Sequence, residues 1–418
     1  MKRRLDPEWP LDVIRALRFR EGSDDGLRRL AAADWKSLLA ATDRDHITLA
    51  LAVRCRSVFP SEAQTYLDGA LQRNAARYGR LCSAYQEIAE ALSAGGIEFH
   101  VLKGFAQWPW YMDDPRHRYQ SDLDLYCRPE FLKRAAEALS GLGYEPHRND
   151  ASGCSDHLPL MIRRTGWTWE GDYYDPNRPP YVEVHFRFWD AETEGFAAGD
   201  AEGFAARSEI REVDGMPLPT LSVIDGLRYS AMHLVRHLLR GDLHVRHVYE
   251  LAHFLERSAD DRAFWEGWRN TGDQAPRLVE AIAFRLAAEW FHCRLHPVAR
   301  RTMEQMPAGA ERWFRLFAFS PALNTTKPNK DELWLHLCLV EDPLVRRRIA
   351  VRRVLPKKRA RVVMDAQTPK GEGGALLCIR RILYEADFLS RRAWHHARTL
   401  LPLLRSGMRW RRATAAFE

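Results

Sequence analysis

The hydrophobic pattern of the chain changes its period at Gly95 and Gly96, and this change sets the fold class. Between Ser61 and Gly95, apolar residues recur three, four or seven positions apart, as in one long amphipathic helix. From Ile97 the pattern alternates or forms short β-rich runs bounded by glycine, which predicts strands. After Ser222 the helical period returns. We therefore expect an α+β protein in which a small mixed β-sheet core is flanked by N-terminal and C-terminal helical regions.

These changes divide the 418 residues into three expected regions: an N-terminal helical region (1–95), a core with the sheet (96–220) and a C-terminal helical bundle with a basic tail (221–418). Strands are expected at 97–102, 122–127, 144–147, 157–163 and 181–188, and the segment 211–217 is expected to contain a turn at Asp214–Gly215. A helix is expected at 129–142, where proline opens the segment and glycine follows it. Further helices are expected at 222–240, 243–257, 265–293, 312–319 and 375–404, and a loop at 368–374.

Positive charge is concentrated at the C-terminal end. The chain carries a formal charge of +7, but residues 346–418 hold 19 Lys and Arg against 5 Asp and Glu, so residues 1–345 are net negative. A basic tail of this kind can bind a polyanion such as RNA, a nucleotide, an acidic peptide or an anionic membrane. A helical surface with many solvated arginines is the simpler alternative.

The cysteines and the apolar segments indicate the compartment. The seven cysteines are scattered and form no Cys-x-x-Cys, which argues against a disulfide scaffold or a cysteine zinc site. The longest apolar stretches fall far short of the ~18–20 residues of a membrane span. The N-terminus is basic but lacks the apolar segment of a secretory signal. We therefore expect a cytoplasmic protein without a transmembrane segment.

Two aspartates alternate with leucines in the segment Ser121–Leu125. Residues two apart on a strand point to the same face, so Asp122 and Asp124 would project together. Neighbouring carboxylates repel unless a cation lies between them, and hard oxygen donors suit Mg²⁺ or Mn²⁺. Glu183 is the candidate third carboxylate, because it lies in another alternating run (181–188). An isolated Asp-x-Asp is usually solvated surface, so the neighbouring segments decide its meaning.

Candidate phosphate-binding residues lie upstream of the two aspartates. Lys103 and Gly104 end the expected strand at 97–102. A glycine lets the backbone approach a phosphate closely, and N–H groups at the start of a following helix can bind it. Lys103 adds a positive charge, and Arg118 and Ser121 lie just before the pair, where they could face the same phosphates.

Other clusters leave alternatives open. His233 and His237 are four apart and share one helical face, so they could contact phosphate or position an acceptor, or be structural. A zinc site is disfavoured there, because no His-Glu-x-x-His and no neighbouring cysteine is present. The aromatic clusters at 108–111 and 167–169 suit stacking on a base or packing of a helix on the sheet.

The order of these motifs resembles the uncharacterised nucleotidyltransferase family of the DNA polymerase β-like superfamily. The matching segments are Leu-Lys-Gly (102–104), Arg-x-x-Ser-Asp-Leu-Asp-Leu (118–125), Gly-Tyr (143–144) and Val-Glu-Val-His-Phe (182–186). Lys103-Gly104 stands where many superfamily members have Gly-Ser. The helix with His233 and His237 and the later Arg-His-Val-Tyr-Glu-Leu (246–251) are similar to the family's helices, although Glu250 stands where an aspartate is usual.

The resemblance implies Mg²⁺-dependent transfer of a nucleoside monophosphate from a nucleoside triphosphate, ATP being the first candidate. It implies three catalytic residues and metal ligands, Asp122, Asp124 and Glu183. The implied nucleotide- or phosphate-binding residues are Lys103, Gly104, Arg118, Ser121, His233 and His237. The acceptor stays open between a small molecule, a peptide or protein, and RNA, and the oligomeric state is not predicted. The alternative is a non-catalytic RNA- or partner-binding protein with a degenerate nucleotidyltransferase core.

Overall fold

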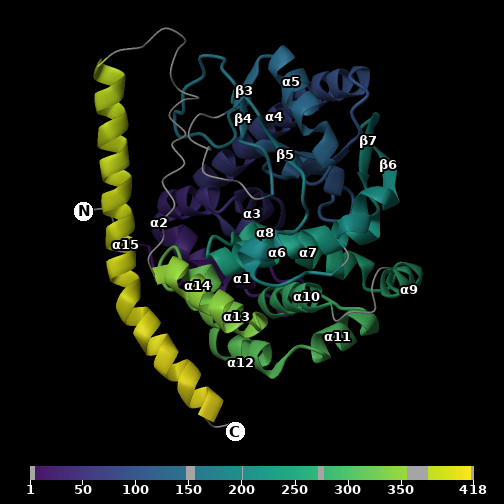
Figure 1. The fold of residues 1–418 in the computed structure, drawn as a ribbon. Helices are drawn as coiled ribbons and strands as arrows, with labels where there is room; N and C mark the ends of the chain where they lie inside the picture. The colour runs from purple at the N-terminus through teal and green to yellow at the C-terminus, as the bar shows by residue number, and fades with distance from the viewer. Residues whose placement is uncertain (1–4, 147–155, 200, 272–276, 355–374, 416–418) are drawn as a thin grey trace.

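The computed structural model describes residues 5–146, 156–199, 201–271, 277–354 and 375–415, and it has the expected α+β architecture (Figure 1). A mixed sheet lies among helices contributed by both ends of the chain. The N-terminal helices are α1 (Trp9–Ala16), α2 (Asp25–Arg44), α3 (Thr48–Arg54) and α4 (Ser61–Ala94). Helix α4 confirms the long amphipathic helix that the sequence predicts before Gly95.

The sheet has seven strands in the order β3-β4-β5-β2-β1-β7-β6. Their bounds are β1 Phe99–Val101, β2 Asp122–Cys127, β3 Tyr144–Pro146, β4 Met161–Arg163, β5 Tyr181–His185, β6 Ser208–Val213 and β7 Met216–Leu221. The central strand β2 pairs antiparallel with β1 and parallel with β5. Strands far apart in the sequence thus become neighbours at the middle of the sheet.

Most expected strands are present but shorter than the sequence pattern. The strand expected at 97–102 is limited to Phe99–Val101. The strand expected at 157–163 is limited to Met161–Arg163, together with an isolated bridge between His157 and His185. The strand expected at 181–188 ends at His185, while His147 lies outside the described residues. The hairpin turn at Asp214–Gly215 is confirmed, and both residues have the positive φ that such a turn requires.

Two of the remaining helices lie between strands in the sequence, α5 after β2 and α6 after β5, and the others follow β7. Their bounds are α5 Leu132–Gly141, α6 Ala191–Glu194, α7 Val223–Arg240, α8 Val245–Ser258, α9 Arg262–Asn270, α10 Leu278–Phe291, α11 Pro297–Glu304, α12 Ala308–Phe317, α13 Glu332–Leu339, α14 Pro343–Val354 and α15 Ala375–Ala415. The single helix expected at 265–293 is two helices, α9 and α10. The loop expected at 368–374 lies outside the described residues. None of the helices in the described part of the chain is long and apolar enough to cross a membrane.

Two hydrophobic cores hold these elements together. The larger core joins α1–α3 to the helices α7, α8 and α10, so it contains residues from both helical regions that the sequence separates. The four tryptophans 265, 268, 290 and 313 are fully buried in it. The second core lies between the sheet and helices α4 and α5. Helix α4 therefore packs directly on the strands that carry the candidate site.

Candidate active site

Two acidic side chains meet on the central strands of the sheet. Asp124 on β2 is directly opposite Glu183 on the parallel strand β5, so both project from the same face. Asp124 is almost fully buried, with 3% of its side chain exposed, and Glu183 is partly buried. The pairing of β2 with β5 therefore brings together two of the three carboxylates that the sequence predicts.

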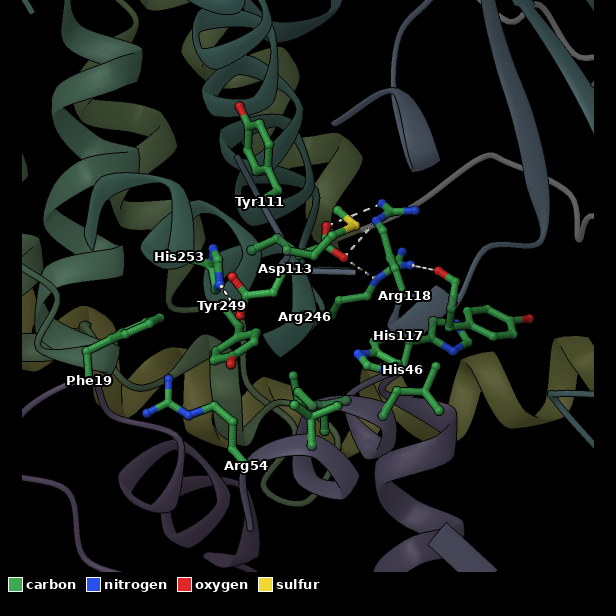
Figure 2. Close-up of a pocket in the computed structure, with 17 residues that line it drawn as sticks. Phe19, His46, Arg54, Tyr111, Asp113, His117, Arg118, Arg246, Tyr249 and His253 are labelled. Carbon is green, nitrogen blue, oxygen red and sulfur yellow. Dashed lines mark hydrogen bonds and ion pairs between the residues drawn. The ribbon is translucent and has the colours of Figure 1, made fainter. Parts of the chain in front are cut away.

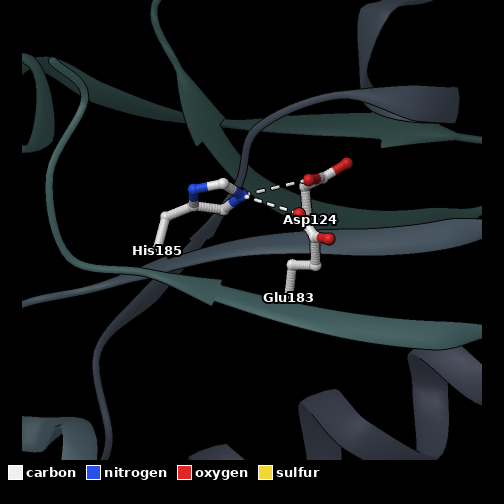
Figure 3. A group of neighbouring side chains, drawn as sticks. All are labelled: Asp124, Glu183 and His185. Carbon is white, nitrogen blue, oxygen red and sulfur yellow. Dashed lines mark hydrogen bonds and ion pairs between the residues drawn. The ribbon is translucent and has the colours of Figure 1, made fainter. Parts of the chain in front are cut away.

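His185 completes this group (Figure 3). It lies two residues after Glu183 on β5, and its Nε2 is 3.1 Å from Asp124 Oδ1 and 3.6 Å from Glu183 Oε2. One ligand atom from each of the three side chains falls within 4.8 Å of the others. No second group of acidic, histidine or cysteine side chains meets this distance among the described residues. Asp122 lies on the same face of β2, two residues before Asp124, but outside this compact group.

The protonation of these groups follows from burial and neighbouring charge. Burial opposes ionisation of Asp124, but the Lys103 ammonium and the hydrogen bond with His185 outweigh it and hold its pKa well below the usual value. Burial and the charge of Asp124 raise the pKa of Asp122. Burial lowers the pKa of His185 to about 4, so its imidazole is neutral at pH 7.

The donor set fits a divalent cation. The buried carboxylate of Asp124, the partly buried carboxylate of Glu183 and the neutral imidazole of His185 can all act as metal ligands. The like charges on Asp122 and Asp124 favour a cation beside them. Oxygen donors suit Mg²⁺, whereas the nitrogen of His185 favours a softer ion such as Mn²⁺.

Lys103 links the carboxylates to a histidine cluster. It follows β1, and its Nζ lies 2.8 Å from Asp124 Oδ1 and 3.2 Å from His233 Nε2 on α7. Burial would lower the pKa of Lys103, but Asp124 and other nearby acidic groups raise it above the usual value. Lys103 is therefore a positive charge held between the acidic side chains of the sheet and α7.

The histidine cluster brings α7 and α8 together beside Lys103. His233 Nε2 lies 3.1 Å from His237 Nε2, and the His247 ring lies 4.9 Å from the ring of His233 and 5.1 Å from that of His237. Burial, reinforced by the Lys103 charge, lowers the pKa of His233. Burial also lowers the pKa values of His237 and His247. The three imidazoles of this cluster are therefore neutral at pH 7.

Gly104 is required by a close contact with Gln120. Its φ is +75°, and a Cβ at this position would lie 2.2 Å from the Gln120 side-chain amide. The Gln120 Oε1 accepts from Phe105 N at 3.1 Å, and its Nε2 donates to Asp122 O at 2.7 Å. The Gln120 amide thus ties the turn after β1 to the start of β2.

Helix α4 fixes the segment before β2. The amide of Asn74 donates to the carbonyls of Arg116 and Arg118 at 2.6 and 3.0 Å. The buried guanidinium of Arg77 donates to the carbonyl of Gln120 at 3.0 Å. The backbone that carries Arg118 and Ser121 is therefore held rigidly against α4.

Arg118 and Arg246 form a basic wall next to Asp122. Arg118 Nε lies 2.9 Å from Glu250 Oε1, and Arg246 on α8 donates to the carbonyl of Tyr119 at 2.6 Å. Both guanidinium charges act to lower the pKa of Asp122, which places them on its side of the site. Ser121 is half-buried, and its carbonyl accepts from Tyr181 N at 3.2 Å where β2 meets β5.

A pocket of about 310 Å³ opens at this basic wall (Figure 2). Arg118, Arg246 and Glu250 form its polar end. Its other wall comes from α3 and the residue before it, with the apolar residues Ile47, Leu49, Ala50 and Val53 and the charged Arg54, and from Phe19 between α1 and α2. This volume and mixture of walls suit a small molecule with an apolar body and a polar end.

The two aromatic clusters have different surroundings. Trp110 stacks on Phe264 with ring centroids 6.2 Å apart, against the larger core, which fits the packing interpretation. Trp167 and Trp169 lie over the guanidinium of Arg178, at 5.9 and 5.4 Å, and Trp169 is 37% exposed. Stacking on a base therefore stays a prediction for the second cluster.

The structure brings most of the sequence-predicted site residues to one place. Five of them form a connected network: Lys103, Asp124, Glu183, His233 and His237. The other four border this network: Gly104, Arg118, Ser121 and Asp122. The sequence analysis did not select His185, Arg246 or His247 as site residues. His185 was detectable from its two-residue spacing from Glu183, whereas the other two become neighbours of the site only through the placement of α8.

Comparison with known proteins identifies one family. The family described as an uncharacterised nucleotidyltransferase matches residues 31–292, from within α2 to the end of α10. The match contains all seven strands of the sheet and every residue of the network, and it stops before α11–α15. No curated protein and no solved structure matches the chain.

Proposed function

The chain belongs to an uncharacterised nucleotidyltransferase family, and from this premise we propose that it transfers a nucleoside monophosphate from a nucleoside triphosphate to an acceptor. ATP is our first candidate for the donor, and the acceptor is a small molecule, a peptide or protein, or RNA. The observation that carries the proposal is the buried group Asp124, Glu183 and His185 beside Lys103.

Asp122, Asp124 and Glu183 are the proposed ligands of Mg²⁺ or Mn²⁺, with His185 as an added donor. A divalent ion bound there would supply charge stabilisation for the triphosphate and activate the acceptor oxygen. The burial of Asp124 supports this assignment, because its carboxylate presents lone pairs in a region shielded from water. The neutral His185 donates from Nε2 to Asp124 Oδ1 in this structure, so an ion bound at Nε2 would replace that proton.

The remaining steps fall to the side chains of this chain. Lys103, His233 and His237 are proposed to bind the triphosphate, with Arg118, Ser121 and the backbone at Gly104 on its other side. The acceptor oxygen forms a bond to the α-phosphorus while the bond to the bridging oxygen breaks, and pyrophosphate leaves. The Glu183 carboxylate, which is partly exposed, is the proposed group that accepts the proton of the acceptor.

The pocket beside Arg118 and Arg246 is proposed to take the organic part of one substrate. Its polar end adjoins Asp122, and its apolar wall on α3 can cover a base or the body of an acceptor. The variant Val53→Trp distinguishes these uses. Weakened nucleotide binding assigns the pocket to the nucleoside, whereas unchanged nucleotide binding with lost transfer assigns it to the acceptor.

The proposal is tested with the variants Asp122→Asn and Asp124→Asn. Both remove a negative charge while keeping the side-chain volume, so they should abolish Mg²⁺-dependent triphosphate binding measured by calorimetry and transfer measured by mass spectrometry of candidate acceptors. Asp68→Asn is the control, because Asp68 pairs with Arg56 on the exposed surface. It should leave both measurements unchanged.

Two results would contradict the proposal. Wild-type activity in both aspartate variants would show that the pair does not hold the catalytic ion. A full-length protein that binds RNA but none of the four common nucleoside triphosphates would favour the alternative of a non-catalytic binding protein. In that case the basic C-terminal segment, and not the carboxylate site, would carry the function.

A further inference from the structure

Helix α15 packs on the body of the protein through one narrow face. It runs along one side of the molecule next to α12, α13 and α14 (Figure 1). Thr399 and Ser406 are buried, Ser406 Oγ accepts from Trp334 Nε1 at 3.0 Å, and the rings of Trp410 and Trp334 stack 6.5 Å apart. These positions are spaced seven and four residues apart, so they lie on the same face of the helix.

A different face of α15 carries a continuous apolar stripe that is exposed. Nine of the fifteen large hydrophobic side chains that are exposed among the described residues lie on this helix, each between 48% and 65% exposed. They are spaced mostly three, four or seven residues apart, and they are Ile379, Ile382, Leu383, Leu389, Trp394, Leu400, Leu401, Leu404 and Met408. Three more, Leu344, Val351 and Val354, lie on α14. An exposed apolar surface of this extent marks a site that binds a membrane or another molecule.

Positive charge accompanies the apolar stripe. The sequence of α15 contains nine arginines and two acidic residues, and α14 contains five arginines and no acidic residue. Arg398, Arg405 and Arg412 are exposed, and at about 100° per residue they fall along the margin of the stripe. An apolar stripe bordered by cations is the pattern of a helix that lies in the plane of an anionic membrane surface.

Other occupants fit this surface less well. A second copy of the chain would bring two helices of the same positive charge together, which is electrostatically unfavourable. A nucleic acid would neutralise the arginines through its phosphates but would leave the apolar side chains in water. Lipid satisfies both, since anionic headgroups meet the arginines while the acyl boundary takes the apolar side chains.

We propose that α15 binds the surface of an anionic phospholipid membrane, lying in its plane with the apolar stripe toward the acyl chains. The stripe lies beyond the segment that matches the nucleotidyltransferase family, so this inference does not depend on the proposed reaction. Membrane attachment through α15 would hold the rest of the protein at the bilayer surface.

The test is cosedimentation of the full-length protein with vesicles. We expect binding to vesicles of phosphatidylcholine mixed with an equal amount of phosphatidylglycerol, weaker binding at high salt, and at least about tenfold weaker binding to phosphatidylcholine alone. The combined variant Leu400→Gln, Leu404→Gln, Met408→Gln should lose at least about tenfold in affinity for the anionic vesicles. Arg405→Gln with Arg412→Gln should weaken binding and reduce its salt dependence.

The matched control is Ile210→Gln, because Ile210 on β6 is an exposed apolar residue outside α15. It should bind like the wild type, and an unchanged circular-dichroism melt in all variants shows that they remain folded. Equal binding of the wild type to both vesicle types, or wild-type binding by the combined variant, would overturn the proposal. So would a protein that binds no vesicles but forms a dimer, or binds RNA, in a way that the combined variant abolishes.

Discussion

Gly104→Ala tests whether the turn after β1 is built around the Gln120 amide. Two effects act against the alanine. A φ of +75° is strained for any residue with a Cβ, and the new Cβ would lie 2.2 Å from Gln120 Nε2. The Gln120 side chain must therefore leave its place and give up its bonds to Phe105 N and Asp122 O.

The magnitude follows from these two effects. The left-handed conformation costs about 1–2 kcal/mol for a residue with a Cβ. Each lost hydrogen bond costs about 0.5–1.5 kcal/mol, so the displacement of Gln120 adds about 1–3 kcal/mol. We expect Gly104→Ala to lower the free energy of unfolding by about 2–5 kcal/mol. Gly143→Ala is the matched control, because Gly143 has a φ of +83° and an added Cβ would meet no atom within 4 Å.

The assay is urea unfolding followed by circular dichroism, on the two glycine variants, Gln120→Ala and the double variant. Gln120→Ala removes the obstructing amide, so in its background Gly104→Ala should cost no more than Gly143→Ala does alone. The coupling between positions 104 and 120 should then be about 1–3 kcal/mol. Strictly additive costs, or equal costs for the two single glycine variants, would refute the reasoning. Gly104→Ala should also weaken triphosphate binding, because Gln120 holds the backbone of Asp122.

Three further outcomes follow from the site. Lys103→Met should lower the free energy of unfolding, measured in urea, by about 3–5 kcal/mol, because Asp124 stays buried without its ion-pair partner at 2.8 Å. The control Lys133→Met, on the exposed surface, should change the free energy of unfolding little. The buried imidazole of His185, with its pKa lowered to about 4, binds no proton between pH 4 and 6.5 in the folded state, whereas the unfolded chain does. Stability should therefore fall as the pH drops from 6.5 to 4, and this dependence should be shallower in His185→Gln, measured by urea unfolding across that range. Val53→Trp should fill the pocket and abolish nucleotidyl transfer. The urea midpoint of unfolding should not change, because the Val53 side chain is half exposed. Unaltered transfer would show that the pocket takes neither substrate.

Much of the fold could be predicted from the sequence, because its signals are local. The period of the apolar residues gives α4, the alternation at Asp122–Cys127 gives β2, and Asp214–Gly215 gives the hairpin of β6 and β7. The strand ends could not be predicted, since pairing depends on the neighbouring strand as well as on the pattern. The split of 265–293 into α9 and α10 falls at a polar segment that contains Gly272 and Pro276, a helix-stop signal that the expectation of a single helix passed over.

The site divides in the same way. The shared face of Asp122 and Asp124 follows from their spacing alone. The position of Glu183 opposite Asp124 depends on β5 lying beside β2, which local periodicity does not specify. The reason for a glycine at position 104 is Gln120, sixteen residues away, and no pattern in the sequence connects the two. Contacts made through tertiary packing are what sequence reasoning leaves out here.

The larger core has a consequence for synthesis on the ribosome. Helices α1–α3 bury their apolar faces against α7, α8 and α10, and Phe19 N donates to Phe291 O at 2.9 Å. The first helices to be translated therefore find these partners only after well over a hundred further residues have emerged. Until then they expose surface that a chaperone can recognise and that can aggregate. A nascent chain stalled before α10 should be retained by such factors, and one that has passed α10 should be released.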